Sequence, residues 1–179
     1  MGFAADAIDP SLYDQVIREP ETRDPRGYIL SADQPDFPSV VIFMNALIKS
    51  GLQVDRATEA FTVGGKTYPA GSFVVKTAQP YRAQVMDMFE AQFHPDNIPY
   101  PGADPIPPHN VTGYTLAYQM GVEFDRVLDG FEAPTARVPD VLAPPPGRLV
   151  AAGAAGDVAS HWANNALLLP HRLPTARLP

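Results

Sequence analysis

Hydrophobic and polar positions between residues 27 and 92 predict a small α/β fold. Residues 27–31 form a short apolar run that is typical of a buried strand. An apolar stripe at helical spacing follows and predicts an amphipathic helix over residues 38–50. Residues 52–57 read as a second strand, so the three elements form a βαβ unit with a parallel strand pair. The stripe consists of Val40, Phe43, Met44, Leu47 and Ile48.

The ends of this helix carry the expected local signals. Asp36 is the candidate N-cap, and Pro38 stands in the first turn, where a missing N–H costs nothing. Gly51 is the candidate C′ residue that ends the helix in a left-handed conformation. The sequence therefore predicts both the start and the end of this helix.

After residue 60 the hydrophobic period changes to two. Residues 61–63 and 66–68 flank Gly64-Gly65, a pair typical of a two-residue β-hairpin turn. A tight turn at 69–71 precedes a third strand at 72–76. Beyond Pro80, apolar residues at helical spacing predict a second amphipathic helix. The predicted fold class is α/β, with a small mixed sheet built from the βαβ unit and extended by the hairpin. The second helical stripe consists of Tyr81, Val85, Met88, Phe89 and Gln92.

Proline marks the boundaries between segments. The 179 residues include 21 prolines, more than twice the usual share of about 5%. Residues 149–179 loosely repeat the pattern of strand, loop and helix, with candidate strands at 149–153 and 156–160 and a helical stretch at 163–169, after which two prolines interrupt it. The predicted organisation is a lead-in segment at 1–26, an α/β core module at 27–92, a proline-rich connector at 93–112, an ordered helical segment packing on the core at 113–132, a proline linker at 133–148, and an incomplete, truncated or poorly ordered α/β segment at 149–179.

Composition and charge exclude several classes of function. The formal net charge is −7, with 13 basic residues among 20 acidic ones, which does not supply the basic surface that binds nucleic acid or an anionic membrane. The chain has no cysteine, so disulfides and thiolate chemistry are excluded. No apolar run approaches the roughly 20 residues of a membrane span, and the N-terminus lacks the pattern of a secretory signal.

Histidines and serines show no local catalytic pattern. A zinc hydrolase commonly places Glu three or four residues after a ligating His, and no histidine here is followed by a carboxylate at either spacing. Ser72 lacks the surrounding glycines of a nucleophile elbow. The Gly153–Gly156 stretch lacks the lysine and helix start of a phosphate loop, so it is interpreted as a turn. A site assembled from distant residues stays open, with His109 and Asp104 as its example. The histidines are His94, His109, His161 and His171.

Three carboxylate pairs and three aromatic residues have structural interpretations. The pairs are predicted to lie on solvated faces, the last two of them on helices. The aromatic residues either cover the sheet, which is favoured, or line a groove. No residue is assigned as catalytic, cofactor-binding or metal-ligating. The pairs are Asp33 with Asp36, Asp87 with Glu90, and Asp125 with Asp129, and the aromatic residues are Tyr81, Phe89 and Phe93.

Several blocks of this sequence resemble one known family. The longest, residues 63–79, reads VGGKTYPAGSFVVKTAQ. Together the blocks resemble the non-catalytic region downstream of the peptidase domain in large bacterial zinc carboxypeptidases of the carboxypeptidase A-like family, over about residues 10–132. The blocks are residues 12–14, 23–30, 33–38, 63–79, 87–90 and 113–122, in the same order as in the family.

The resemblance implies a periplasmic or secreted parent protein. That parent would bind zinc through a His-x-x-Glu pair and a distant His, in a peptidase domain that these residues do not contain. No cofactor is therefore expected in this chain, and its expected partner is the peptidase domain. The resemblance also suggests that the chain is a fragment whose frame is lost or cut near residue 167.

Three functions follow as hypotheses. The first is an accessory, non-catalytic fragment of a zinc carboxypeptidase-like protein, inactive alone. The second is a stand-alone peptide- or carbohydrate-binding module that uses the hairpin edge at 61–75 or the proline-rich loop at 95–108. The third is an enzyme with an unrecognised site, which would need a pocket where histidine and carboxylate groups converge.

Overall fold

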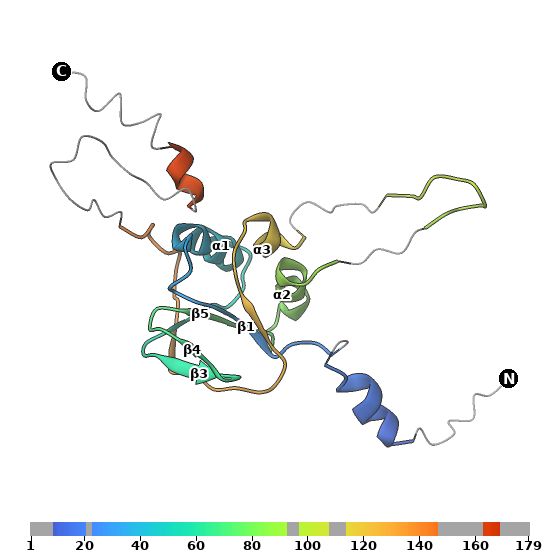
Figure 1. The fold of residues 1–179 in the computed structure, drawn as a ribbon, viewed down its shortest axis with the longest axis horizontal. Coiled ribbons are helices and arrows are strands. Elements are labelled where there is room, and N and C mark those ends of the chain that lie inside the picture. Colours follow the sequence, from blue (N-terminus) through green and yellow to red (C-terminus); the bar gives the residue numbers. More distant parts are fainter. Residues whose placement is uncertain (1–8, 21–22, 93–96, 108–113, 147–162, 169–179) are drawn as a thin grey trace.

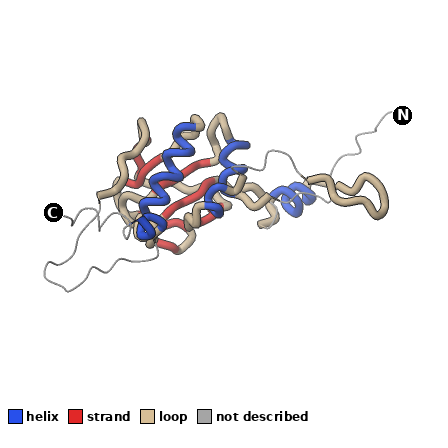
Figure 2. The backbone as a smooth tube through the Cα atoms, turned by 90° about the horizontal axis from the view of Figure 1, so that it is seen from above, coloured by secondary structure: helices blue, strands red, loops and turns tan. Residues whose placement is uncertain are grey.

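A computed structural model describes residues 9–20, 23–92, 97–107, 114–146 and 163–168. A five-stranded sheet lies between a layer of helices and a two-stranded hairpin (Figures 1 and 2). The strands are β1 (Gly27–Leu30), β2 (Asp55–Ala57), β3 (Phe61–Val63), β4 (Lys66–Tyr68), β5 (Phe73–Lys76), β6 (Asp125–Val127) and β7 (Thr135–Arg137). The helices are α1 (Phe37–Lys49), α2 (Arg82–Phe89), α3 (Leu116–Gln119), a π-helix η1 (Tyr13–Ile17) and a 3₁₀ helix η2 (Asn164–Leu168).

The predicted ends of α1 are confirmed. The Asp36 side chain accepts a hydrogen bond from the backbone N–H of Ser39, and a proline lies in the first turn. At the other end, Gly51 has φ +84°, and its N–H donates to the Ile48 carbonyl at 3.0 Å. The N–H of Leu52 donates to the Leu47 carbonyl, also at 3.0 Å. These two bonds form a Schellman motif and satisfy carbonyls that the helix end would otherwise leave free.

Two hydrophobic cores lie on opposite faces of the sheet. In β1, Tyr28 and Leu30 point to the helices, whereas Ile29 between them points to the hairpin. All four residues of β1 are buried because both faces of the strand are covered. On the hairpin side, Phe61 and Tyr68 stack with their ring centroids 5.3 Å apart. The hairpin is therefore a third layer of the fold.

The α/β class is confirmed, but the predicted parallel pair is wrong. Strand β5 lies between β1 and β2 and pairs antiparallel with both, so β1 and β2 run in the same direction without being neighbours. The described strand pairs are all antiparallel, which corrects the expected mixed sheet. Phe73, Val74 and Val75 of β5 are fully buried. Such a strand fits the centre of a sheet, where both faces are covered.

The hairpin forms where it was predicted, but it does not extend the main sheet. Gly64 and Gly65 have φ of 58° and 80°, as a type I′ turn requires. Strands β3 and β4 pair with each other and form a separate two-stranded sheet. Burial explains this arrangement, because Phe61 and Tyr68 cover Ile29 and lie on its face rather than at an edge.

Two further strands occur where the sequence predicted none. Strand β6 follows the helix α3 in the segment 113–132, which was expected to be helical or otherwise ordered, and it pairs with β1 at one edge. Strand β7, in the expected linker 133–148, pairs with β2 at the other edge. The linker is also tied to α1, because Asn45 Nδ2 donates to the Leu142 carbonyl at 2.9 Å and Asn45 Oδ1 accepts from the Leu142 N–H at 2.7 Å. Each of these strands has three residues, two of them polar, so neither carries a clear apolar pattern.

The C-terminal prediction falls mostly outside the described residues. The strands expected near 149–153 and 156–160 lie outside the described residues. Residues 163–169 were expected to be helical, and Asn164–Leu168 form the 3₁₀ helix η2. The Asn164 N–H donates to Asp36 Oδ2 at 2.9 Å, which joins η2 to the start of α1. Among the helices that the structure describes, none has the length and hydropathy to cross a bilayer.

Candidate functional site

A polar pocket of about 420 Å³ lies where two connections meet the hairpin. The loop between β1 and α1 supplies Ser31, Asp33 and Gln34 to its wall. The hairpin supplies Lys66 and Thr67. The connection from α3 into β6 supplies residues 123–125. Its volume is in the range of sites for small ligands, although its lining is more polar than most of them.

Gln34 holds two walls of the pocket together. Its Nε2 donates to the Ser31 carbonyl at 3.0 Å and to the Glu123 carbonyl at 3.2 Å. Its Oε1 accepts a 3.0 Å hydrogen bond from the Glu123 N–H. The Ser31 hydroxyl also donates to Oδ1 of Asp33. The backbone at Glu123 is thus fixed, whereas its carboxylate has no hydrogen-bond partner among the described residues.

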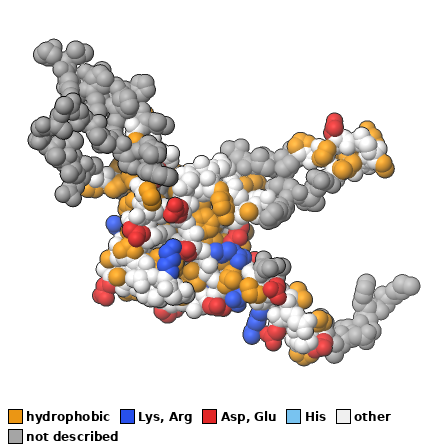
Figure 3. All heavy atoms as spheres, in the orientation of Figure 1, with side chains coloured by type: hydrophobic (Ala, Val, Ile, Leu, Met, Phe, Trp, Pro, Cys, Tyr) orange, Lys and Arg blue, Asp and Glu red, His pale blue; other side chains and the backbone are white. Residues whose placement is uncertain are grey.

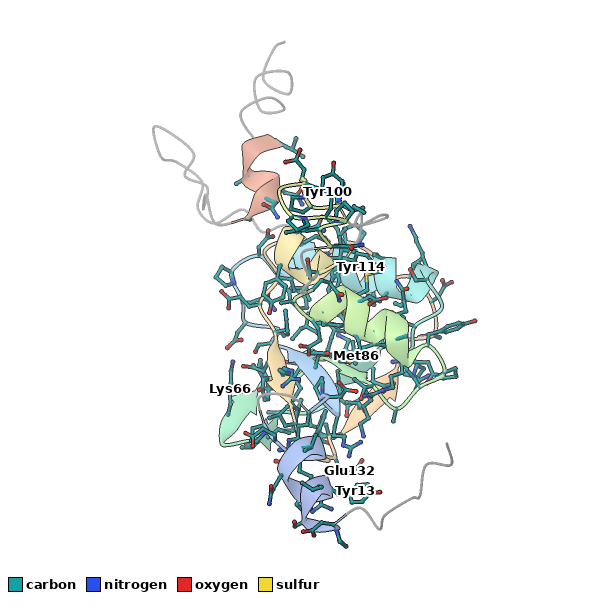
Figure 4. The ribbon with its side chains drawn as sticks, turned by 90° about the vertical axis from the view of Figure 1, so that its right-hand side faces the viewer. Tyr13, Lys66, Met86, Tyr100, Tyr114 and Glu132 are labelled. Atoms are coloured by element: carbon teal, nitrogen blue, oxygen red, sulfur yellow. The ribbon has the colours of Figure 1, made fainter. Side chains whose placement is uncertain are left out.

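Asp125 joins the hairpin to the edge of the sheet. Its Oδ2 accepts from Lys66 Nζ at 2.6 Å and from the Tyr68 hydroxyl at 3.0 Å. Figure 4 shows Lys66 on the hairpin beside β6. Burial, and then the hydrogen bond to Asp125, raise the pKa of the Tyr68 hydroxyl, so this phenol stays neutral and donates. The Lys66 ammonium is already paired, so it leaves little positive charge for an anionic ligand.

A second polar cluster is centred on Tyr28. Its hydroxyl donates to Glu90 Oε1 at 2.6 Å, and Arg126 Nε donates to the same oxygen at 2.8 Å. Arg126 Nη2 also donates to the Arg23 carbonyl at 2.6 Å. Burial, and then the bond to Glu90, raise the pKa of Tyr28. This cluster ties α2, β1 and β6 together and does not line the pocket, so we interpret it as a structural anchor.

The structure brings two of the sequence-selected carboxylates, Asp33 and Asp125, into one pocket. Asp36 instead caps α1, Glu90 binds Tyr28, and Asp129 pairs with Arg23 at 3.0 Å. The expected helical position of Asp125 is wrong, because it begins β6. Local spacing therefore did not indicate which carboxylates lie together.

The serine, aromatic and histidine residues selected in the sequence analysis lie in different parts of the chain. The buried Ser72 hydroxyl donates to the Pro69 carbonyl at 2.7 Å and accepts from the Ala32 N–H at 3.1 Å, so it stabilises turns. Phe89 is fully buried and stacks on Tyr28 at 4.1 Å, which confirms a packing role. Tyr81 is 58% exposed. Outside the described residues lie the four histidines, Phe93 and residues 153–156.

Gln34, Lys66, Thr67 and Glu123 are pocket residues that sequence reasoning did not select. They come from segments about 30 and 60 residues apart, and no short motif joins them. The one useful signal was the Gly-Gly turn, because it placed Lys66 and Thr67 on one hairpin strand. No cluster of three or more potential metal-ligating His, Cys, Asp or Glu side chains occurs in the described part of the chain.

The described part of the proline-rich connector, residues 97–107, is a closed loop with exposed apolar side chains. The Ala103 N–H donates to the Tyr100 carbonyl at 3.0 Å, and Gly102 has φ +86°. The Ile106 N–H donates to the Asn97 carbonyl at 2.9 Å and closes the base of the loop. Tyr100 is 67% exposed, and orange side chains mark the loop away from the sheet in Figure 3. Asp104 belongs to this loop and not to the pocket.

Comparisons with known proteins leave the function to be argued from this geometry and from the resemblance. No protein-family model, curated protein or solved structure matched the chain.

Proposed function

We propose that this chain is a non-catalytic accessory module of a zinc carboxypeptidase-like protein and that it packs against the peptidase domain. The observation that carries the proposal is the place of the longest resembling block, residues 63–79, in the fold. This block forms β4, the following turn and the central strand β5. The resemblance therefore lies in residues that build a fold, which is the pattern expected of a module without its own chemistry.

Other resembling blocks have similar structural roles. Residues 27–30 form β1, and Tyr28, Ile29 and Leu30 are fully buried. Thr77 is buried, and its hydroxyl donates to the Pro25 carbonyl at 2.7 Å. A module of this kind needs an outer surface for the peptidase domain. The helices offer one, because Ile42 on α1 is 52% exposed and Tyr118 on α3 is 59% exposed.

A binding experiment with a peptidase domain tests this proposal. The chain would be titrated against the zinc-loaded peptidase domain of a carboxypeptidase A-like protein from the resembling family, by calorimetry. We expect association with a dissociation constant in the micromolar range. We also expect the combined variant Ile42→Lys and Tyr118→Lys to bind at least tenfold more weakly, because both changes place a charge on the proposed contact surface.

The matched control places charge on the opposite layer. Thr62→Lys on the exposed side of the hairpin should leave the affinity unchanged. Absence of association at 100 µM would contradict the proposal, as would hydrolysis of a peptide by the purified chain. Circular dichroism of each variant checks that the fold is retained, so a loss of binding can be assigned to the surface.

The second candidate function is a peptide- or carbohydrate-binding module. The pocket favours it, because hydroxyl, carboxylate and ammonium groups of the hairpin and two connections converge on one cavity of about 420 Å³. A module can serve both functions, since the pocket lies at the hairpin and the proposed peptidase contact lies on the helices. NMR titration of the purified chain with short peptides and with oligosaccharides tests this candidate.

A further inference from the structure

One strand of the hairpin has outward backbone groups without a hydrogen-bond partner among the described residues, at a residue that lines the pocket. Val63 and Lys66 flank a two-residue turn, so they exchange the hydrogen bonds of the closing pair. Thr62 and Thr67 are then a non-hydrogen-bonded pair, and their hydroxyls lie 3.0 Å apart. The N–H and C=O of Thr67 therefore point outward from β4, and no hydrogen bond to them occurs among the described residues.

Thr67 is one of the residues that line the pocket, and this cavity of about 420 Å³ is large enough for part of a ligand. An extended peptide can pair with an exposed strand edge through its own N–H and C=O groups. One peptide residue opposite Thr67 would satisfy both groups at once. A sugar hydroxyl can bond to either group, but it lacks the fixed donor and acceptor spacing of a peptide.

The charges around the cavity select among peptides. The Lys66 ammonium is held by Asp125 at 2.6 Å. The carboxylates of Asp33 and Glu123 remain, and both side chains are exposed at the cavity wall. Basic side chains next to the paired residue would be attracted to these carboxylates, whereas acidic ones would be repelled.

We propose that β4 binds an extended, lysine- or arginine-containing peptide segment by strand addition at Thr67, with its basic side chain beside Asp33 and Glu123. This inference rests on the second candidate function, a ligand-binding module, and specifies its ligand. It does not depend on the accessory role. The contact is small, so the expected affinity for a short peptide is weak, in the high micromolar to millimolar range.

The experiment uses pooled peptides and the whole ¹⁵N-labelled chain. One pool has lysine at the centre of five residues, acetyl-Xaa-Xaa-Lys-Xaa-Xaa-amide, and the other has glutamate there. We expect the lysine pool to shift the Thr67 amide signal and to slow its hydrogen exchange. The glutamate pool should give less than one fifth of that shift. A lysine pool with N-methylated backbone amides should give a much smaller shift, because it can accept from the Thr67 N–H but cannot donate to the Thr67 carbonyl.

Two variants with matched positions test the backbone contact. Thr67→Pro removes the outward N–H of a residue that lines the pocket, and Thr62→Pro removes the equivalent outward N–H on the other strand. Both lose the bond between the threonine hydroxyls, so their effects on hairpin stability are comparable. We expect Thr67→Pro to weaken binding of the lysine pool at least tenfold and Thr62→Pro to leave it within twofold, as followed by the other pocket amides.

A charge series tests the selection for basic peptides. Asp33→Asn combined with Glu123→Gln should weaken binding of the lysine pool about fivefold. It should also reduce the difference in affinity between the lysine pool and the glutamate pool. Glu59→Gln is the control, because Glu59 is exposed and does not line the pocket.

Each other outcome separates the inference from the function on which it rests. If cellobiose or chitobiose, but not the peptides, shifted the amide signals of the pocket residues, the inference would be overturned. The chain would still be a ligand-binding module. Peptide binding elsewhere on the chain would do the same. No shift with peptides or sugars at 5 mM would overturn both.

Discussion

The hydroxyl of Tyr28 donates a 2.6 Å hydrogen bond to Oε1 of Glu90, and this joins the inner strand β1 to the end of α2. The tyrosine side chain is fully buried, whereas Glu90 is partly exposed. Arg126 of the edge strand β6 binds the same carboxylate oxygen at 2.8 Å. A carboxylate that follows α2 thus connects that helix to two neighbouring strands.

Tyr28→Phe should destabilise the fold by about 1–2 kcal/mol. The variant keeps the ring stacked on Phe89 and loses one hydrogen bond to a charged group. Glu90 remains paired with Arg126, so the loss is smaller than that of an unpaired buried charge. Denaturant unfolding measures the effect. Tyr118→Phe is the control, because Tyr118 is 59% exposed. The free energy of unfolding of this variant should lie within about 0.5 kcal/mol of that of the unsubstituted chain.

The raised pKa of Tyr28 predicts that the fold loses stability at alkaline pH. Burial and the bond to Glu90 raise the pKa of Tyr28 in the folded state, whereas an unfolded tyrosine ionises near pH 10. Above about pH 10 the unfolded chain therefore releases a proton that the folded chain keeps. The free energy of unfolding should fall by up to about 1.4 kcal/mol per pH unit from this residue, with the full contribution present below pH 10.

Unfolding measured between pH 8 and pH 11.5 tests this dependence. Tyr28→Phe should flatten the decline above pH 10 without changing the profile below it. The raised pKa of Tyr68 has the same sign, so Tyr68→Phe should flatten the decline as well. Identical slopes in the original chain and in both variants would show that neither hydroxyl is held neutral by the fold.

Local signals in the sequence were sufficient to predict α1 and the hairpin. Asp36, Gly51 and the Gly64-Gly65 pair each act on the backbone within a few residues, and the structure has a cap, a Schellman motif and a type I′ turn there. The order of the strands was not predictable in this way. Strand β5 separates β1 from β2 because its side chains are buried on both faces, and this depends on how all the layers pack.

The pocket could not be predicted from the sequence for a related reason. Its walls meet through hydrogen bonds between distant segments, such as Gln34 with Glu123 and Lys66 with Asp125. Strand β6 contributes Asp125 and has three residues, so neither its hydrophobic pattern nor its length indicated a strand. Sequence reasoning could select Asp33 and Asp125 as acidic residues, but it could not place them beside the hairpin.

The effect of a Gly64 substitution on stability should depend on the backbone conformation at this position rather than on contacts of the new side chain with its neighbours. Its φ is 58°, and a Cβ atom there would have no neighbour within 4 Å. Gly64→Asn should be neutral or slightly stabilising, since Asn-Gly is favoured in type I′ turns. Gly64→Val should cost about 1–2 kcal/mol, because a branched side chain is strained in this region. Gly130→Ala is the control, since Gly130 has no positive φ and an open environment. Equal stabilities for the Asn and Val variants would rule out backbone strain as the cause.

Asp36→Ala should have a larger effect than the loss of an ordinary helix cap. Asp36 accepts from the Ser39 N–H at 3.3 Å, the Ser39 hydroxyl at 2.7 Å and the Asn164 N–H at 2.9 Å. A cap contributes about 1 kcal/mol, and the bond to Asn164 adds the attachment of η2. We expect a decrease of about 1–2 kcal/mol in thermal or denaturant unfolding. We also expect at least tenfold faster hydrogen exchange at the Asn164 amide.

Two variants separate the cap from the attachment of η2. Ser39→Ala keeps the N–H that Asp36 caps and removes the hydroxyl, which bonds Asp36 and accepts from Asn164 Nδ2 at 2.9 Å. It should destabilise less than Asp36→Ala and leave the Asn164 amide protected by Asp36. Asp33→Ala, three residues earlier in the same loop, should change neither the free energy of unfolding nor the exchange of the Asn164 amide much. The hydrogen bond between Asp33 and Ser31 is exposed. If Asp36→Ala left exchange at Asn164 unchanged, η2 would be held by other contacts, and Asp36 would act on α1 without joining the two helices.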